Sequence, residues 1–248
     1  MSQDDRTASP PYLSLVAPVY NERECIEEFV READAELKKL GRSYEIVCVD
    51  DGSQDGSREI LRGLKPRFSA LRVVGLERNC GQSAAFAAGV QFARGALIAL
   101  MDADLQNDPA DIPRLLAVLE GPERPDCVAG CRAARRDNWL RRLSSRIANR
   151  VRIWITHDPV RDIGCSLKLF RAEYLKRVKL YRGMHRFLTT LIRMEGGTVR
   201  VVDVHHRPRP KGTPKYGHGL GRTFTALRDA FAVRWMQSRC LRYKAEEL

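Results

Sequence analysis

Short apolar segments that alternate with helical segments constrain the fold of this chain more than any other feature of its sequence. The apolar segments cover residues 12–18, 44–49, 71–76 and 96–101. The segments between them have the spacing or composition of helices, at residues 22–40, in a short stretch ending at Leu64, and at residues 83–93. Strands that alternate with helices form βαβ units around a mainly parallel sheet. We therefore expect an α/β fold, with a Rossmann-like, mainly parallel sheet flanked by helices.

A polar motif follows each of the four predicted strands. The motifs are Pro18–Glu22, Asp50–Ser53, Arg78–Gln82 and Asp102–Gln106. Ligands of open parallel sheets bind beyond the carboxyl ends of the strands, so we expect these motifs to meet at one edge of the sheet. The chain has neither a G-x-G-x-x-G motif after its first strand nor a G-x-x-x-x-G-K-[ST] motif. A dinucleotide fold and a P-loop are therefore not indicated.

The fourth motif carries two carboxylates directly after an apolar run. If the chain stays extended there, Asp102, Asp104 and Gln106 point the same way. Neighbouring carboxylates raise each other's pKa unless a cation lies between them, and oxygen ligands suit Mg²⁺ or Mn²⁺. The motif indicates a metal–diphosphate site. The D-x-D pattern is short, however, and Asp is also common in solvated loops and at helix N-caps.

The second half of the chain continues the alternation less regularly. We expect a helix at residues 111–119 and strands at residues 126–130, 162–170 and 198–205. The resulting division is a disordered leader at 1–11, an α/β domain at 12–205, a mobile basic loop at 206–219 and a C-terminal amphipathic helix at 220–248. The loop is rich in Pro, Gly and cations, and it either closes over a phosphate or is an exposed linker.

Two segments of the second half have amphipathic patterns. Residues 138–155 place Trp139 and Trp154 in an apolar stripe bordered by arginines. This pattern suits a membrane surface, and it suits equally a domain helix with a solvated basic face. The C-terminal helix carries four large apolar residues on one face: Phe224, Leu227, Phe231 and Trp235.

The formal net charge of +12 indicates an anionic partner. Aromatic residues make up only 7% of the chain and no known nucleic-acid motif occurs, so we expect no nucleic-acid partner. No apolar run approaches the length of a membrane span, and the N-terminus lacks the apolar core of a secretory signal. The seven cysteines are scattered, which favours reduced thiols over disulfides or zinc. These features favour a cytoplasmic location.

Five motifs together resemble those of family 2 glycosyltransferases. They are P-V-Y-N-E (18–22), D-D-G-S-x-D-G-S (50–57), R-N-x-G-Q (78–82), M-D-A-D-L-Q (101–106) and H-R-P-R-x-K-G-x-x-K-Y-G (206–217). The pattern is most similar to the polyprenyl-phosphate branch, of the dolichol-phosphate mannose synthase type, and it spans residues 14–235. The resemblance implies a GT-A catalytic domain, a nucleotide-sugar donor, a divalent cation (Mg²⁺ or Mn²⁺) and inversion at the anomeric carbon.

The resemblance also implies roles for individual residues. Those expected to bind the nucleotide are Pro18, Tyr20, Glu22, Val49, Asp51, Asp102 and Ala103. Those expected to hold the metal are Asp102, Asp104 and Gln106. Those expected to act in catalysis are Asp104, Arg132, Arg209 and Lys215. Asn107 stands where the family often has an acid, which weakens any expectation of a base at that position.

A lipid-phosphate acceptor makes such a base unnecessary. The acceptor oxygen is already anionic at pH 7, so the enzyme needs cations to bring two anions together and to stabilise the departing diphosphate. No histidine is required, and we expect all five to be loop or surface residues. The protein would meet its lipid at the inner face of the membrane, peripherally or through a membrane-anchored partner.

Two alternatives remain open from the sequence. A family 2 transferase with a non-lipid hydroxyl acceptor would need a carboxylate base, for which Asp162 is the best candidate. The second alternative is a non-catalytic basic module that binds lipid or nucleic acid on the same fold. Such a module would not need the D-x-D motif, so the intact motif argues against it.

Overall fold

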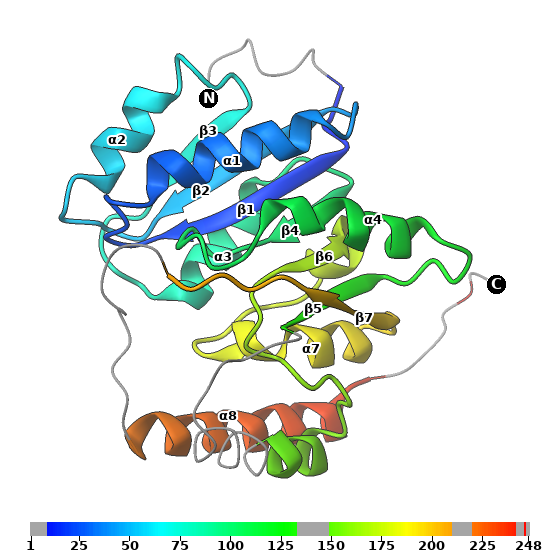
Figure 1. Ribbon diagram of the computed structural model, residues 1–248. Helices are drawn as coiled ribbons and strands as arrows, with labels where there is room; N and C mark the ends of the chain where they lie inside the picture. Colours follow the sequence, from blue (N-terminus) through cyan, green and yellow to red (C-terminus); the bar gives the residue numbers. More distant parts are fainter. Residues whose placement is uncertain (1–8, 133–148, 210–219, 242–245, 247–248) are drawn as a thin grey trace.

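The computed structural model describes residues 9–132, 149–209, 220–241 and 246. Its centre is a seven-stranded sheet with the order β3-β2-β1-β4-β6-β5-β7 (Figure 1). The strands β3, β2, β1 and β4 are parallel to one another, β6 is antiparallel to both of its neighbours, and β7 is parallel to β5. The predicted α/β fold with a mainly parallel sheet is confirmed.

The strands lie close to the predicted positions. They are β1 (Leu13–Val19), β2 (Tyr44–Asp50), β3 (Leu71–Gly75), β4 (Leu97–Leu100), β5 (Cys127–Arg132), β6 (Lys168–Arg171) and β7 (Val199–Val204). The α-helices are α1 (Ile26–Lys38), α2 (Ser57–Leu64), α3 (Gln82–Phe92), α4 (Ile112–Glu120), α6 (Ala172–Leu175), α7 (Leu188–Met194) and α8 (Leu220–Arg239). Two 3₁₀ turns, η2 (Pro109–Asp111) and η3 (Met184–Phe187), precede α4 and α7.

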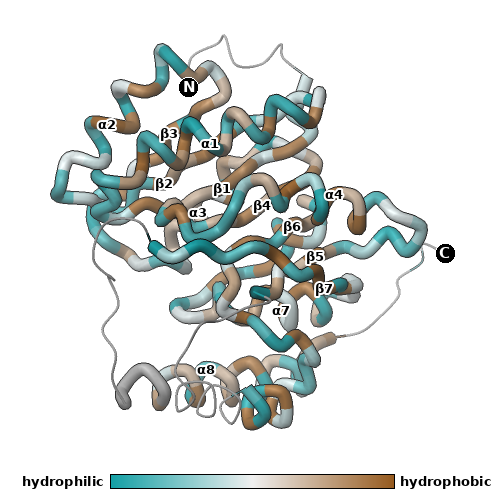
Figure 2. The backbone as a smooth tube through the Cα atoms, in the orientation of Figure 1, coloured by the Kyte–Doolittle hydropathy of each residue, from teal (hydrophilic) through white to brown (hydrophobic). Residues whose placement is uncertain are grey.

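Helices cover both faces of the sheet. The alternation of side chains along β1 sends Leu13, Leu15 and Ala17 to the face covered by α1, α2 and α4, and Val16 to the face covered by α3 and α7. Figure 2 shows the hydrophobic residues gathered in the central strands. A third apolar cluster joins α8 to η3 and α7 through Ala230, Val233, Met184, Phe187 and Leu191, with Ile155 beside them. α8 is thus an outer layer packed on the α7 side of the sheet (Figure 1).

Helix α3 lies unusually close to the sheet. Its small side chains let Gly89 approach so near that an added Cβ would lie 2.2 Å from Val16 Cγ1 and 3.0 Å from Val49 Cγ2. This close approach is what the small-residue composition of the segment indicates. It also fixes the start of α3, and with it Gln82, at the carboxyl edge of the sheet.

Three expectations about element boundaries are wrong. The first helix begins at Ile26 and not at Glu22: residues 23–25 form a turn, and the backbone N–H groups of Asn21 and Glu22 donate to the Ser53 and Ser57 hydroxyls. The strand expected at 162–170 covers only Lys168–Arg171, because the preceding residues form a turn. The C-terminal helix, expected to span residues 220–248, ends at Arg239, and the described residues 240 and 241 are not helical.

Several expectations fall wholly or partly outside the described residues. They concern the leader at 1–8, most of the basic segment at 138–155 including Trp139, most of the loop at 206–219 including Lys215, and the last residues of the chain. The described part of the basic segment, residues 149–156, is helical as expected. All seven cysteines are described and free of disulfides. No helix in the described ranges is both long and apolar enough to cross a membrane.

We expect Gly89→Ala to lower the free energy of unfolding by about 1–3 kcal/mol, because the added methyl group overpacks the interface between α3 and the sheet. The control is Gly63→Ala in α2, where an added Cβ meets nothing within 4 Å. The control should be neutral or should stabilise by up to about 1 kcal/mol, since Ala favours helix more than Gly does. Urea denaturation measures both, and equal stability of the two variants would contradict the prediction.

Candidate active site

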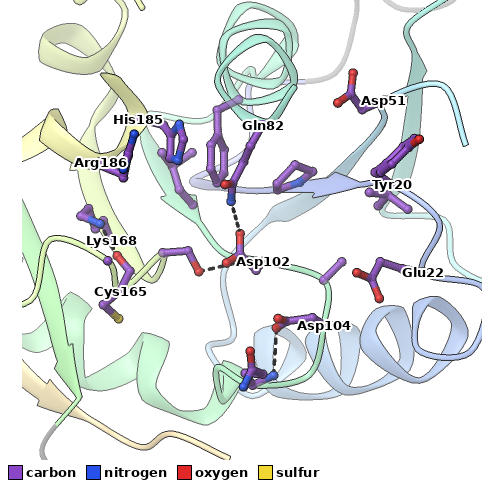
Figure 3. Close-up of a pocket in the computed structure, with 18 of the residues that line it drawn as sticks. Tyr20, Glu22, Asp51, Gln82, Asp102, Asp104, Cys165, Lys168, His185 and Arg186 are labelled. Atoms are coloured by element: carbon purple, nitrogen blue, oxygen red, sulfur yellow. Dashed lines mark hydrogen bonds between the residues drawn. The ribbon is translucent and has the colours of Figure 1, made fainter. Parts of the chain in front are cut away.

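A cavity of about 360 Å³ opens at the carboxyl ends of β1, β2 and β4. The four polar motifs expected at this edge do meet around it. The lining residues that the sequence predicted are Pro18, Tyr20, Glu22, Asp51, Asp102, Ala103, Asp104, Gln106 and Arg209. In the close-up, Tyr20, Glu22 and Asp51 lie on one side of Asp102, and Lys168, His185 and Arg186 lie on the other (Figure 3). The cavity therefore has an acidic side and a basic side.

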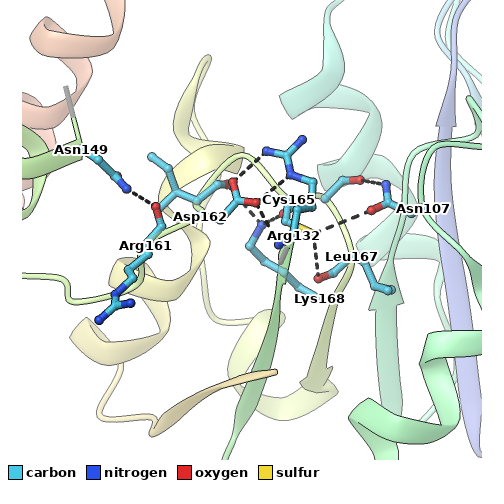
Figure 4. Close-up of polar contacts among 10 residues, drawn as sticks. Asn107, Arg132, Asn149, Arg161, Asp162, Cys165, Leu167 and Lys168 are labelled. Atoms are coloured by element: carbon cyan, nitrogen blue, oxygen red, sulfur yellow. Dashed lines mark hydrogen bonds and ion pairs between the residues drawn. The ribbon is translucent and has the colours of Figure 1, made fainter. Parts of the chain in front are cut away.

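Two of the predicted residues that the structure describes do not line the cavity. Val49 is fully buried at the end of β2, in the core cluster that packs against α3, so its side chain serves the fold. Arg132, at the end of β5, forms a bidentate ion pair with Asp162 (Figure 4). Its Nε and Nη2 atoms lie 2.6 and 2.7 Å from the two carboxylate oxygens. The carboxylate of Asp162, which the sequence suggested as a base for a hydroxyl acceptor, is therefore bound by Arg132.

Asp51 links the second and third motifs on the acidic side. Its carboxylate accepts hydrogen bonds from the backbone N–H groups of Cys80 and Gly81, at 2.7 and 2.9 Å. Burial raises the pKa of Asp51, although the two backbone N–H groups oppose that effect. Gly52 has a φ of +72°, and an added Cβ there would lie 2.5 Å from the backbone of Arg78. Glycine is therefore required for the two loops to come this close.

The D-x-D motif turns where the extended-chain prediction expected it to continue straight. β4 ends at Leu100, Asp104 Oδ1 accepts the backbone N–H of Gln106 at 3.1 Å, and Leu105 has a left-handed φ of +62°. The Leu105 side chain remains buried in the core, which holds this uncommon conformation in place. The three predicted metal-binding residues reach the same cavity through this turn and not through strand alternation.

Asp102 lies at the centre of the cavity, in contact with groups from two distant segments. It accepts a hydrogen bond from Gln82 Nε2 at 2.7 Å, and its backbone N–H donates to Ser166 Oγ at 3.1 Å. Burial and the neighbouring charge of Asp104 raise the pKa of Asp102 to about 6, while Ser166, Lys168 and Gln82 partly offset that rise. The acid pair is thus an arrangement that a further cation would stabilise.

The donor set at this turn fits a divalent cation that prefers oxygen. Two carboxylates and the Gln106 amide line one cavity, and the pKa of Asp102 is raised by burial and by the charge of Asp104, both of which such an ion would counter. The described residues contain no group of three or more His, Cys, Asp or Glu side chains arranged to hold a metal. An ion here would therefore take two carboxylates from the protein and further oxygens from Gln106 and from substrate phosphates.

Two residues of the segment after β7 bind to side chains near the D-x-D loop and on α1. His205 contacts Asp111 through its backbone N–H and its Nδ1, at 2.7 and 2.9 Å. Arg207 pairs with Glu32 and Asp108, at 2.7 and 2.6 Å.

These contacts place Arg209 inside the cavity. Its Nη2 lies 3.0 Å from Glu22 Oε1 and 3.2 Å from Asp104 Oδ2. Arg209 therefore bridges the first motif and the D-x-D motif, as the fifth motif of the resemblance suggests.

The turn before β6 and the first residue of β6 line the basic side of the cavity. We had expected these residues to form one strand at 162–170. Lys168 is fully buried, and its Nζ donates to the carbonyl oxygen atoms of Ile163 and Cys165 (Figure 4). Ser166 Oγ accepts from Asn107 Nδ2 at 2.8 Å, which joins this turn to the D-x-D loop. The alternating run Leu167–Phe170 concealed the turn, because it marks a strand without showing where the strand begins.

His185 and Arg186 in η3 also line the cavity. We expected every histidine to be a loop or surface residue, and for His185 that expectation is wrong. The sequence gives little indication that His185 lies in the cavity. It belongs to the single turn η3, whose two end residues, Met184 and Phe187, are buried in the core. Only the packing of η3 against α3 brings His185 next to Ser83, with Nδ1 and Oγ 2.7 Å apart.

We expect binding of Mn²⁺ to weaken about tenfold between pH 7 and pH 5. The folded-state pKa of Asp102 lies above its ordinary value, so the folded protein without metal binds this proton more tightly than the unfolded chain does. The ionisation of Asp102 therefore lowers the stability of the metal-free protein as pH rises from about 4 to about 6. Below pH 6 a proton on Asp102 competes with Mn²⁺ for the carboxylate.

The electron paramagnetic resonance signal of free Mn²⁺ measures this affinity. Asp203→Asn, which removes an exposed carboxylate on β7, should retain the pH dependence, and Asp102→Asn should lose the binding. Equal affinity of the unaltered protein at pH 5 and pH 7 would show that Asp102 is not a ligand.

Comparison with known proteins assigns the family. The model of Glycosyl transferase family 2 matches residues 14–179. The chain is 40% identical over 237 residues to the dodecaprenyl-phosphate galacturonate synthase of Rhizobium johnstonii, covering 94% of this chain and 68% of that protein. It is 37% identical over 207 residues to the undecaprenyl-phosphate 4-deoxy-4-formamido-L-arabinose transferase of Edwardsiella ictaluri, covering 83% of this chain and 63% of that protein. The chain thus spans about two thirds of the length of these relatives.

Solved structures show the same fold at low sequence identity. The glucosyl-3-phosphoglycerate synthase of Mycobacterium tuberculosis, in complex with UDP, has a TM-score of 0.64 and 19% identity, covering 94% of this chain and 82% of that one. The mannosyltransferase PcManGT of Pyrobaculum calidifontis, in complex with GDP-Man and Mn²⁺, has a TM-score of 0.60 and 17% identity, covering 93% and 74%. These findings confirm the predicted GT-A fold class, and the matched family model and relatives show that this chain belongs to glycosyl transferase family 2.

Proposed function

We propose that this protein transfers a sugar from a nucleotide sugar to a polyprenyl phosphate, with inversion at the anomeric carbon. The observation that carries the proposal is a single cavity with an acid pair on one side and cationic side chains on the other. The names of the two relatives described above support a polyprenyl-phosphate acceptor. The complexes of two structural neighbours support a nucleotide-sugar donor and a divalent ion.

The acidic side suits the donor. Pro18, Tyr20, Glu22 and Asp51 border the space for the nucleoside, with Asp102 and Ala103 at its inner end. Asp102, Asp104 and Gln106 would hold Mg²⁺ or Mn²⁺, which supplies charge stabilisation to the departing diphosphate. Arg209 contacts both Glu22 and Asp104, so its guanidinium lies where it can also meet a donor phosphate oxygen.

The reaction requires one bond to form and one to break. An oxygen of the acceptor phosphate attacks the anomeric carbon of the sugar from the face opposite the nucleotide. The bond from that carbon to the diphosphate oxygen breaks, and the diphosphate leaves with the electron pair. No proton has to be removed from the acceptor, because its oxygen is already anionic near neutral pH. The protein contributes by placing the two anions in line and by balancing their charge.

A hydroxyl acceptor is disfavoured by the same geometry. It would need a carboxylate to take its proton, and the sequence candidate for that role is Asp162. Both oxygens of Asp162 are engaged by Arg132, and neither residue lines the cavity. Arg132 and Asp162 are partly buried and held together by two short hydrogen bonds, so we assign this ion pair a structural role at the end of β5.

We expect Asp104→Asn to abolish metal-dependent transfer, with a loss of at least 100-fold in kcat/KM, while the fold is retained. The reason is that the amide removes the negative charge from one of the two carboxylates of the site. Transfer of radiolabelled sugar to a short polyprenyl phosphate in the presence of Mn²⁺ measures the effect. Asp203→Asn serves as the control and should be unaffected. Unchanged turnover by purified Asp104→Asn would remove the metal site from the mechanism.

The exposed face of α8 suits contact with a membrane surface. Phe224, Leu227, Phe231 and Trp235 lie on one face, and Phe231 and Trp235 are 55% and 64% exposed. Exposed arginines flank them at Arg228, Arg234 and Arg239. Trp154, on the helical segment at residues 149–156, is 75% exposed. Aromatic rings bordered by cations match the interface of an anionic bilayer, so we propose peripheral attachment at the inner face of the membrane.

We expect Phe231→Ser combined with Trp235→Ser to reduce binding to anionic liposomes at least tenfold, because two interfacial aromatic rings are lost. Phe92→Ser removes an aromatic ring that is exposed to a similar extent, 48%, at the end of α3, and it should leave binding unchanged. Cosedimentation with vesicles of phosphatidylglycerol and phosphatidylcholine measures both variants. Equal binding of the double variant and the control would exclude α8 as the membrane contact.

A further inference from the structure

Four of the described side chains that line the cavity are basic or can become so: Lys168, His185, Arg186 and Arg209. Arg209 bridges two carboxylates, and the Nζ of Lys168 is fixed against two backbone carbonyls beside Asp102. Both therefore serve the acidic centre of the cavity. His185 and Arg186, which project from η3, lie away from the residues assigned to the nucleotide (Figure 3).

The turn η3 is held from two sides by buried polar groups. On the α3 side, Ser83 Oγ lies 2.7 Å from His185 Nδ1 and accepts the backbone N–H of Gly183 at 3.0 Å. On the α8 side, Arg186 Nη2 donates to Asp229 Oδ2 at 3.0 Å. Gly183 has a φ of +85°, and an added Cβ there would lie 2.3 Å from Asp229 Oδ2. The positions of both side chains are thus set by contacts with two helices.

These contacts connect the cavity to the proposed membrane face. Asp229, Ala230 and Val233 lie on the buried face of α8, against η3 and α7. The aromatic stripe that contains Phe231 and Trp235 lies on the opposite face of the same helix. The thickness of one helix, about 10 Å, therefore separates η3 from the surface that suits a bilayer. The turn η3, which carries His185 and Arg186, is thus the part of the cavity wall that packs against α8.

We propose that His185 and Arg186 form the binding corner for the phosphate of the polyprenyl acceptor. This inference rests on the proposed function and names the residues that hold its second substrate. A guanidinium has five N–H donors, so Arg186 can keep its bonds to Asp229 and to the Gly183 carbonyl while it binds a phosphate oxygen. The imidazole of His185, oriented by Ser83, supplies a second contact beside it. The acceptor oxygen is then held on the side of Asp102 opposite the nucleotide, as in-line attack requires.

The test compares Arg186→Gln and His185→Gln with the exposed neighbour Arg182→Gln, which does not line the cavity. Steady-state transfer is measured in detergent micelles, so that membrane attachment does not contribute. We expect Arg186→Gln to raise the KM for the polyprenyl phosphate at least tenfold and His185→Gln to raise it at least threefold. The KM for the nucleotide sugar should stay within twofold in both variants, which also shows that each variant is folded. Arg182→Gln should match the unaltered protein.

Two further variants separate binding from packing. Arg186→Lys keeps the charge, and it should recover part of the acceptor affinity that Arg186→Gln loses. Asp229→Asn keeps the shape of the side chain but weakens the bond that orients Arg186, so it should raise the acceptor KM by a smaller factor. Its liposome binding should equal that of the unaltered protein, because the outer face of α8 is unchanged.

A binding measurement distinguishes failure of this inference from failure of the proposed function. Calorimetric titration with farnesyl phosphate, a soluble prenyl phosphate, needs no turnover, and Arg186→Gln should weaken that binding at least tenfold. If the unaltered protein binds farnesyl phosphate through Arg186 but transfers no sugar to a polyprenyl phosphate, the proposed function is wrong and the phosphate corner stands. A rise in the nucleotide-sugar KM with an unchanged acceptor KM would place both residues at the donor sugar and overturn the inference. Unchanged constants in both variants would overturn it as well.

Discussion

Two carboxylates held side by side at the end of a buried strand are the constraint on which the rest of this structure depends. Burial and the neighbouring charge of Asp104 raise the pKa of Asp102 and so oppose its ionisation. The groups that offset this repulsion come from distant segments: Gln82 at the start of α3, Lys168 in β6 and Arg209 after β7. The acid pair thus explains why α3, β6 and the segment after β7 converge on one edge of the sheet, and why the cavity lies there.

The cavity is divided according to charge, and the division follows the architecture. Its acidic side comes from the loops after β1, β2 and β4, which belong to the parallel half of the sheet. Its basic side comes from β6 and η3, which belong to the half that carries α8. A nucleotide bound on the first side and a lipid phosphate bound on the second would meet near Asp102. If the outer surface of α8 contacts a bilayer, as we propose, the basic side is the side of the cavity nearest to that bilayer.

Ion pairs decide which basic residues are able to act in this cavity. Arg132 and Arg209 carry the same charge and both were expected to act in catalysis, yet their environments differ. Arg132 is bound by Asp162 outside the cavity, whereas Arg209 reaches Glu22 and Asp104 inside it. A formal charge of +12 therefore says little about catalysis, because many cations are used to balance buried acids. The same pairing engages both oxygens of Asp162, the residue considered as a base for a hydroxyl acceptor.

The sequence by itself determined the fold class and the acidic side of the cavity. Both follow from local signals: apolar runs that alternate with helical spacing, and polar motifs that must lie at the carboxyl ends of parallel strands. Only the tertiary structure decided that the chain turns at Leu105 and that Val49 is buried. It also decided that Arg132 lies outside the cavity and that His185 lines it. The physical reason is distance along the chain. The contact of Arg209 with Glu22 joins residues 187 positions apart, and the contact of His185 with Ser83 joins residues 102 apart, so no local pattern records them.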